Sequence, residues 1–163
     1  MKKENIDYTK LVNVLSQNTN LLRAYFYDGL PADATPKKKN FLETLQKKGI
    51  QLRLKILKRR KLICKKCRDV TIREVQKGVD VSLATDILRH AWQNTCNICI
   101  IVSGDEDYKD DIDVAKDKGI KIWVASFRDS LSSELERTAD KVILLDKLFN
   151  DIIFTEDKSK KLI

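Results

Sequence analysis

The chain is poor in histidine, proline and glycine, with one His, two Pro and five Gly among 163 residues. The single histidine, His90, nearly excludes mechanisms that need one histidine as base and another as metal ligand. No apolar run approaches the length of a membrane-spanning helix, and the first residues lead into no apolar signal core. No Gly-x-Gly-x-x-Gly sequence occurs, so a dinucleotide-binding Rossmann protein is set aside. We therefore expect a cytoplasmic protein with no membrane partner.

Charge is distributed unevenly along this chain, whose formal net charge is +8. Positions 37–68 hold fourteen Lys or Arg residues and one acid, Glu43, whereas positions 105–157 hold fifteen acids and eight bases. A basic segment of this kind is typical of proteins that bind nucleic acid, although a solvated lysine-rich surface would have the same composition. Nucleic acid is the better of the two interpretations.

The apolar pattern predicts strands that alternate with helices. We expect strands at 21–27, 50–57, 98–102, 120–124 and 142–145, and helices at 6–15, 37–48, 78–92, 106–118 and 132–138. This alternation predicts a Rossmann-like α/β fold, a mostly parallel sheet flanked by helices, with a small β-hairpin insertion around 58–76. The length fits a single domain over 1–155 and a basic, flexible tail at 156–163. We place both Trp92 and Trp123 in the core.

Acidic residues stand where two of the expected elements begin or end. Asp105 and Asp107 follow the strand that ends at Val102, while Asp80 lies in the first turn of a helix and Asp86 nearly two turns later. Ligand sites of doubly wound sheets lie beyond the carboxyl ends of the strands, and carboxylates suit Mg²⁺ or Mn²⁺. The alternative is that these acids only cap helices and complement their dipoles. Spacing alone does not decide between Asp80 and Asp86.

Three segments, in this order, carry a resemblance to a known family: Tyr25-Phe-Tyr-Asp-Gly29, Lys77-Gly-Val-Asp-Val-Ser-Leu-Ala-Thr-Asp86 and Val102-Ser-Gly-Asp-Glu-Asp-Tyr108. Together they resemble the NYN domain, a branch of the PIN-like nuclease superfamily, and the resemblance covers nearly the whole chain. It implies that Asp80, Asp105 and Asp107 are metal-binding, catalytic acids of a Mg²⁺- or Mn²⁺-dependent ribonuclease. The alternative is a catalytically inactive RNA-binding or scaffold domain of the same fold.

One departure from the family concerns its first strand. NYN domains open with a short apolar strand that ends in an Asp-Gly-x-Asn-like motif, whose Asp is a metal ligand. No such motif precedes Leu11 here, so the resemblance implies a member without that strand, or a sequence that starts late. The absence favours the scaffold interpretation and leaves enzymatic activity open. A gap in the sheet would expose unpaired backbone, which a second copy or a partner chain could fill.

The basic segment supplies candidate RNA-binding residues. Arg53 and Lys55 alternate with the apolar residues Leu52, Leu54 and Ile56, which predicts a strand with one positive face. We expect phosphate contacts along this face and its extension into the hairpin, and stacking of a base on a tyrosine. The predicted RNA-binding residues are Arg53, Lys55, Lys58, Arg59, Arg60, Lys61 and Tyr27.

The four cysteines form two Cys-x-x-Cys pairs, Cys64 with Cys67 and Cys96 with Cys99. Two such pairs can form a tetrahedral zinc site, but the separation here is longer than usual. Cys99 also lies inside an expected strand, where residues three apart point to opposite faces. We therefore place Cys99 in the core and keep Cys64 and Cys67 as a candidate half-site for structural Zn²⁺.

Overall fold

The structure, a computed structural model, describes residues 6–63, 67, 69–75 and 78–154, without the side chains at 59–63 and 72–75. The chain divides into two compact units, one of residues 22–93 and one of residues 1–21 with 94–163. We call the first the basic unit, since it holds eighteen Lys or Arg against seven Asp or Glu, and the second the acidic unit, with fourteen against seventeen. The single-domain expectation stays a prediction, and the tail at 156–163 lies outside the described residues.

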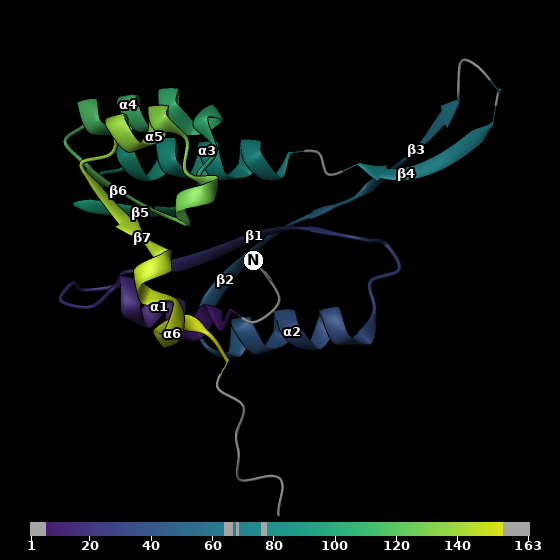
Figure 1. Cartoon of the computed structure of the whole chain (residues 1–163), viewed down its shortest axis with the longest axis horizontal. Helices are drawn as coiled ribbons and strands as arrows, with labels where there is room; N and C mark the ends of the chain where they lie inside the picture. Colours follow the sequence, from purple (N-terminus) through teal and green to yellow (C-terminus); the bar gives the residue numbers. More distant parts are fainter. Residues whose placement is uncertain (1–5, 64–66, 68, 76–77, 155–163) are drawn as a thin grey trace, which may run out of the picture. The chain divides into compact units, whose positions relative to one another are not determined.

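The basic unit contains a parallel strand pair between two helices. Its elements, before the hairpin and after it, are β1 (Ala24–Leu30), α2 (Pro36–Lys47), β2 (Ile50–Ile56) and α3 (Val79–Trp92). β1 and β2 are parallel, as a strand, helix and strand in succession require. Phe26 meets Phe41 of α2 with ring centroids 5.8 Å apart, whereas Tyr25 meets His90 of α3 at 5.4 Å. Neighbouring strand residues point to opposite faces, so α2 and α3 cover opposite sides of the pair (Figure 1).

A β-hairpin leaves this strand pair. β3 (Lys58–Ile63) and β4 (Val70–Val75) are antiparallel, with Lys58 opposite Val75 and Ile63 opposite Val70. The hairpin projects away from the rest of the basic unit (Figure 1). The hairpin predicted around 58–76 is confirmed.

The acidic unit is built on a three-stranded parallel sheet in the order β5-β6-β7. Its elements are α1 (Tyr8–Leu15), β5 (Ile98–Val102), η2 (Glu106–Tyr108), α4 (Lys109–Asp117), β6 (Lys121–Ser126), η3 (Arg128–Ser130), α5 (Ser133–Thr138), β7 (Lys141–Leu144), η4 (Leu145–Leu148) and α6 (Phe149–Ile152). The α4 and α5 helices lie on one side of the sheet, and α1 and α6 on the other (Figure 1). The predicted α/β fold with parallel strands flanked by helices is confirmed.

Both faces of the central strand β6 are buried. Ala125 packs in a cluster with Leu11 and Leu15 of α1 and with Ile152 of α6. Val124 points to the opposite face because side chains alternate along a strand, and it is fully buried. The core of the acidic unit therefore lies on both sides of β6.

Several expected boundaries and environments differ from the structure. β1 spans 24–30 rather than 21–27, because its parallel pairing with β2 continues to Leu30. The helix expected at 106–118 is divided into η2 and α4. Trp92 is 73% exposed, so its assignment to the core was wrong, while Trp123 is half-buried. Ile56 is 71% exposed, so the apolar face of β2 does not reach the strand end. No described helix has the length and apolar content needed to cross a membrane.

Candidate carboxylate site and nucleic-acid surface

Asp105 and Asp107 stand at the carboxyl end of β5 in the acidic unit. Asp105 is the N-cap of η2, and its Oδ1 accepts a hydrogen bond from the backbone N–H of Asp107 at 3.1 Å. The N–H of Asp105 donates to Ser103 Oγ at 3.2 Å. Both aspartates are exposed. The capping role that the sequence left open is thus present, and it coexists with solvent access to both carboxylates.

The turn that carries Asp105 is held against the loop after β6. The N–H of Ser132 donates to the carbonyl of Gly104 at 2.9 Å. A Cβ atom on Gly104 would lie 1.8 Å from the carbonyl oxygen of Ser130 and 2.8 Å from Ser126 Oγ. Only glycine fits this close approach of two backbones. Gly104 therefore fixes the position of the Asp105 turn relative to the end of β6.

The two acids of α3 in the basic unit have different environments. Asp80 is exposed in the first turn of α3, directly after Val79. Asp86 is only 6% exposed, although it is a charged residue. The structure therefore distinguishes the two acids, which their spacing in the sequence could not do. Asp80 is the one that a ligand in solvent can reach.

Three donors surround the carboxylate of Asp86. Its Oδ2 accepts hydrogen bonds from Tyr27 Oη at 2.9 Å and from Arg53 Nε at 3.0 Å, and its Oδ1 lies 2.7 Å from Arg89 Nη2. The guanidinium of Arg53 also lies over the ring of Tyr25, 4.8 Å from the centroid. We call these five residues the Asp86 cluster. Two of the predicted RNA-binding residues, Arg53 and Tyr27, are therefore engaged inside the basic unit.

The Asp86 cluster shifts the pKa of its members. Burial raises the pKa of Asp86, but the hydrogen bonds from Arg53 and Tyr27 and the charge of Arg89 outweigh it, so the net pKa is lowered. Burial, followed by the hydrogen bond to Asp86, raises the pKa of Tyr27. The carboxylate is thus charged and the phenol neutral at physiological pH. Sequence patterns missed this cluster, although the tyrosines of β1 alternate and Arg53 is in register with Tyr27.

Further lysines extend the positive surface of the basic unit. Lys55 and Lys58 are exposed, as the predicted phosphate contacts require. Arg59, Arg60 and Lys61 lie in β3, but their side chains are outside the described part of the structure.

A hollow of about 630 Å³ lies after the carboxyl end of β1 and is lined in part by Thr35 and Lys38. Lys38 forms an ion pair with Asp28 of β1.

The cysteines do not form a described metal site. Cys67 is exposed, while Cys64 lies outside the described residues, so the zinc half-site stays a prediction. Cys99 is partly buried in β5, and burial raises the pKa of its thiol to about 12. Among the residues that the structure describes, neither unit brings together three His, Cys, Asp or Glu side chains that could hold a metal ion.

The fold is that of a Rossmann-like α/β protein, and a solved structure shares it. A protein of unknown function, VPA0982 from Vibrio parahaemolyticus RIMD 2210633, matches with a TM-score of 0.69 and 23% identity over 92% of this chain and 83% of that one. A model of the NYN domain matches residues 1–146. The chain belongs to the NYN domain family, which is part of the PIN-like superfamily, and the predicted resemblance is confirmed.

A curated relative is similar over a shorter region. The uncharacterized protein y4oD of Sinorhizobium fredii (strain NBRC 101917 / NGR234) is 33% identical over 76 residues, which are 45% of this chain. The matched region is 36% of that relative, so the similarity spans about a third of its length.

Proposed function

We propose that this NYN domain is a divalent-metal-dependent ribonuclease whose metal-binding, catalytic carboxylates are Asp80, Asp105 and Asp107. Membership of the family supports the nuclease class. The observation that carries the proposal is the exposed Asp105–Asp107 pair on an anchored turn at the carboxyl end of a parallel strand. Ligands of open α/β sheets bind at that end of the strands.

The residues present fit a hydrated Mg²⁺ or Mn²⁺ ion. Such an ion is commonly held by one or two carboxylates with water and substrate phosphate, rather than by a complete cage of protein ligands. Asp105 and Asp107 supply two exposed carboxylates within the acidic unit. Asp105 Oδ1 already accepts the N–H of Asp107, so Oδ2 is the proposed metal-facing oxygen. The proposal also requires Asp80 to approach the same ion.

The chain's own residues would position the substrate and the ion. A bound Mg²⁺ or Mn²⁺ would supply an activated water and stabilise charge on the phosphoryl group. The hydrogen bond from Asp107 to Asp105 restricts the rotamer of the Asp105 carboxylate. Lys55 and Lys58, both exposed, would attract the phosphates of RNA and make its binding dependent on salt.

Cleavage of a labelled single-stranded RNA with Mn²⁺ or Mg²⁺ tests the proposal. We expect wild type to cleave and Asp105→Asn to cleave only at background level, because the amide cannot replace a carboxylate ligand. Asp117→Asn is the matched control, since Asp117 is an exposed acid at the end of α4. If wild type leaves the RNA intact with either ion, or if Asp105→Asn cleaves like wild type, the assignment of these carboxylates is wrong.

The second candidate function is RNA binding without catalysis. It is favoured by the charge of the basic unit, which contains eighteen bases and seven acids. This excess of positive charge would attract RNA whether or not the carboxylates bind a metal ion. Replacing Arg59, Arg60 and Lys61 together by alanine should weaken binding to all sequences alike and reduce the salt slope by about 2. The matched control replaces Lys109, Lys118 and Lys121 of the acidic unit. RNA binding that is unchanged in the first variant, or undetectable at low salt, would remove this interpretation.

A further inference from the structure

The strand β7 is one of the two outer strands of the three-stranded sheet in the acidic unit. β7 pairs with β6 along one edge, and no other strand among the described residues pairs with it. The backbone groups on the open edge of a strand can pair with an additional strand. Recognition by strand addition uses such an edge, and specificity then comes from contacts to alternate side chains. The open edge of β7 is therefore a candidate binding surface.

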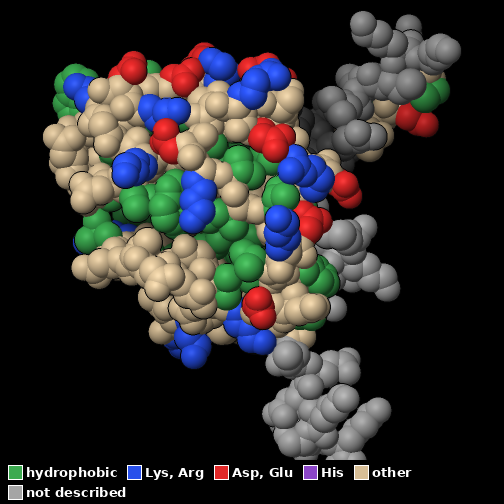
Figure 2. All heavy atoms as spheres, turned by 60° about the vertical axis from the view of Figure 1, so that its left-hand side comes forward, with side chains coloured by type: hydrophobic (Ala, Val, Ile, Leu, Met, Phe, Trp, Pro, Cys, Tyr) green, Lys and Arg blue, Asp and Glu red, His purple; other side chains and the backbone are tan. Residues whose placement is uncertain are grey.

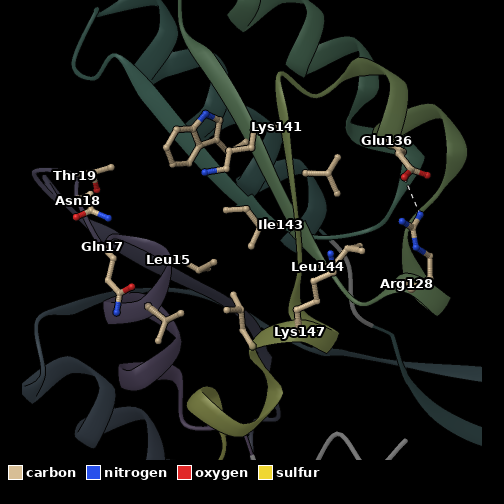
Figure 3. Close-up of a pocket in the computed structure, with 14 residues that line it drawn as sticks. Leu15, Gln17, Asn18, Thr19, Arg128, Glu136, Lys141, Ile143, Leu144 and Lys147 are labelled. Atoms are coloured by element: carbon tan, nitrogen blue, oxygen red, sulfur yellow. Dashed lines mark hydrogen bonds and ion pairs between the residues drawn. The ribbon is translucent and has the colours of Figure 1, made fainter.

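A groove runs along β7, and apolar side chains from both faces of this strand line it. It has a volume of about 590 Å³, and its lining includes Leu15, Trp123, Val142, Ile143, Leu144 and Leu148. Lys141 and Ile143 project from one face of β7, whereas Leu144 projects from the other (Figure 3). A strand added at this edge would place its own alternate side chains beside each of these faces.

The charge of the groove differs from that of its surroundings. Positions 105–157 hold eight bases and fifteen acids. Three of these bases, Arg128, Lys141 and Lys147, line the groove, but only one of these acids, Glu136, does so. Glu136 is already paired with Arg128 at 2.8 Å. The groove thus has a surplus of two lysines in a unit where acids outnumber bases. Figure 2 shows cationic side chains beside hydrophobic ones on the protein surface.

We propose that this groove binds an extended segment of another polypeptide, in which apolar and acidic side chains alternate, by strand addition at β7. The main chain of the segment would pair with the open edge, its apolar side chains would contact Ile143 and Leu144, and its carboxylates would approach Lys141 and Lys147. Lys141 is already positioned, with its Nζ 4.1 Å from the centroid of the Trp123 ring. The inference does not depend on ribonuclease activity.

An RNA strand fits this groove less well than a polypeptide. Phosphates would satisfy Lys141 and Lys147, but a phosphodiester backbone has no amide groups to pair with the open edge of β7. RNA would also leave the backbone of β7 and much of the apolar lining without matching contacts. The observations therefore favour a polypeptide, and RNA becomes an outcome of the test.

Fluorescence anisotropy with labelled synthetic peptides tests the proposal on the full chain. A peptide that alternates valine and glutamate should bind saturably, whereas one that alternates valine and lysine should not. Lys141→Glu combined with Lys147→Glu should weaken binding of the valine–glutamate peptide by roughly tenfold or more and allow the valine–lysine peptide to bind. Lys118→Glu combined with Lys121→Glu makes the same charge change at two exposed lysines of the acidic unit outside the groove, so it should have no effect. Equal affinity for both peptides, or no binding of the valine–glutamate peptide, would overturn the proposal.

Hydrogen exchange distinguishes strand addition from nonspecific attraction. With the valine–glutamate peptide bound, alternate amides of β7 should exchange more slowly, while those of β5 should not change. Oligouridine should neither compete with the peptide nor protect β7. Binding without protection of β7, or displacement of the peptide by oligouridine, would contradict strand addition in this groove.

Discussion

The basic and acidic units use their carboxylates in opposite ways. In the basic unit, Asp86 is buried and its carboxylate is engaged by Tyr27, Arg53 and Arg89. In the acidic unit, Asp105 is exposed, with its Oδ1 accepting the N–H of Asp107. A buried charge requires partners inside the fold, whereas an exposed one can exchange water for a ligand. The comparison teaches that two aspartates of the same charge are not functionally equivalent when one is engaged inside the fold and the other is exposed.

The interior surfaces of the two units also differ in polarity. One face of the β1–β2 pair in the basic unit carries polar and aromatic groups, including Tyr25 over the guanidinium of Arg53. Both faces of β6 in the acidic unit are apolar, with Val124 on one and Ala125 on the other. The first arrangement depends on charge and the second on packing. Substitutions of charge should therefore have larger effects on the stability of the basic unit.

The largest expected effect comes from Asp86→Asn. The change removes the buried carboxylate that engages Arg53 and Arg89, whose side chains are 34% and 43% exposed, and loss of one partner of a buried charge is destabilising. We expect the free energy of unfolding to fall by about 3 kcal/mol. Urea unfolding at neutral pH measures it, with Asp117→Asn as the exposed control. Equal stability of the two variants would show that the Asp86 cluster contributes little.

A smaller loss of stability is expected from Gly104→Ala. The new Cβ would overlap the carbonyl of Ser130, so the turn after β5 must move, at a cost of about 2 kcal/mol. Gly49→Ala is the control, because Gly49 has a φ of +84° but no atom within 4 Å of an added Cβ, and strain alone should cost about 1 kcal/mol. Cleavage should be lost only in the first variant, since its displaced turn carries Asp105. Retained cleavage would mean that the turn need not be fixed.

Local sequence patterns predicted the elements of the fold well. A continuous apolar run followed by Ser-Gly-Asp indicated a parallel strand ending at Val102, and the structure has β5 end there. The hairpin after β2 was also predicted, because its two short strands are joined locally. Boundaries set by a partner were less accurate: β1 continues to Leu30 because β2 pairs with it throughout.

The candidate site was predictable only in part. Asp105 and Asp107 follow a strand directly, so their shared exposed turn could be inferred from neighbouring residues. The Asp86 cluster joins residues separated by 59 positions for Tyr27 and by 33 for Arg53, and no local pattern reports such contacts. The exposure of Trp92 could not be predicted either, because helical periodicity does not indicate how far a neighbouring element extends.

Acidification should reduce the stability of the basic unit. Burial, with the charge of Arg89, lowers the pKa of His90, and the Asp86 cluster lowers that of Asp86. A group whose pKa is lower in the folded state stabilises above its unfolded pKa and loses this contribution as pH falls, so the decline should begin near pH 6.5 for His90 and continue below about 4 for Asp86.

Urea unfolding at pH 7.5 and 5.5 measures the histidine part. Wild type should lose stability between these values, and His90→Gln should lose less. In the acidic unit, burial raises the pKa of Asp111, so the contribution of this group has the opposite pH dependence and increases stability as pH falls through its folded pKa. A wild type whose stability does not decrease, or a variant that declines equally, would contradict the assignment to His90.

The smallest expected effect on stability comes from Asp105→Asn. Asparagine is also a good N-cap and can accept the N–H of Asp107, so the turn should keep its hydrogen bond. The change also removes one negative charge beside Glu106 and Asp107, which reduces repulsion between like charges. We expect the free energy of unfolding to change by less than about 0.5 kcal/mol.

The response of the melting temperature to Mn²⁺ should distinguish Asp105→Asn from wild type more clearly than the free energy of unfolding without the ion. An ion that binds only the folded state stabilises it by an amount that increases with the ratio of ion concentration to Kd, so Mn²⁺ should raise the melting temperature of wild type and have less effect on the variant. Thermal unfolding with and without Mn²⁺ measures both quantities, with Asp117→Asn expected to respond like wild type. If Asp105→Asn instead loses as much stability as Asp86→Asn, the Asp105 carboxylate is required by the fold, and the contrast between an engaged and an exposed carboxylate does not hold.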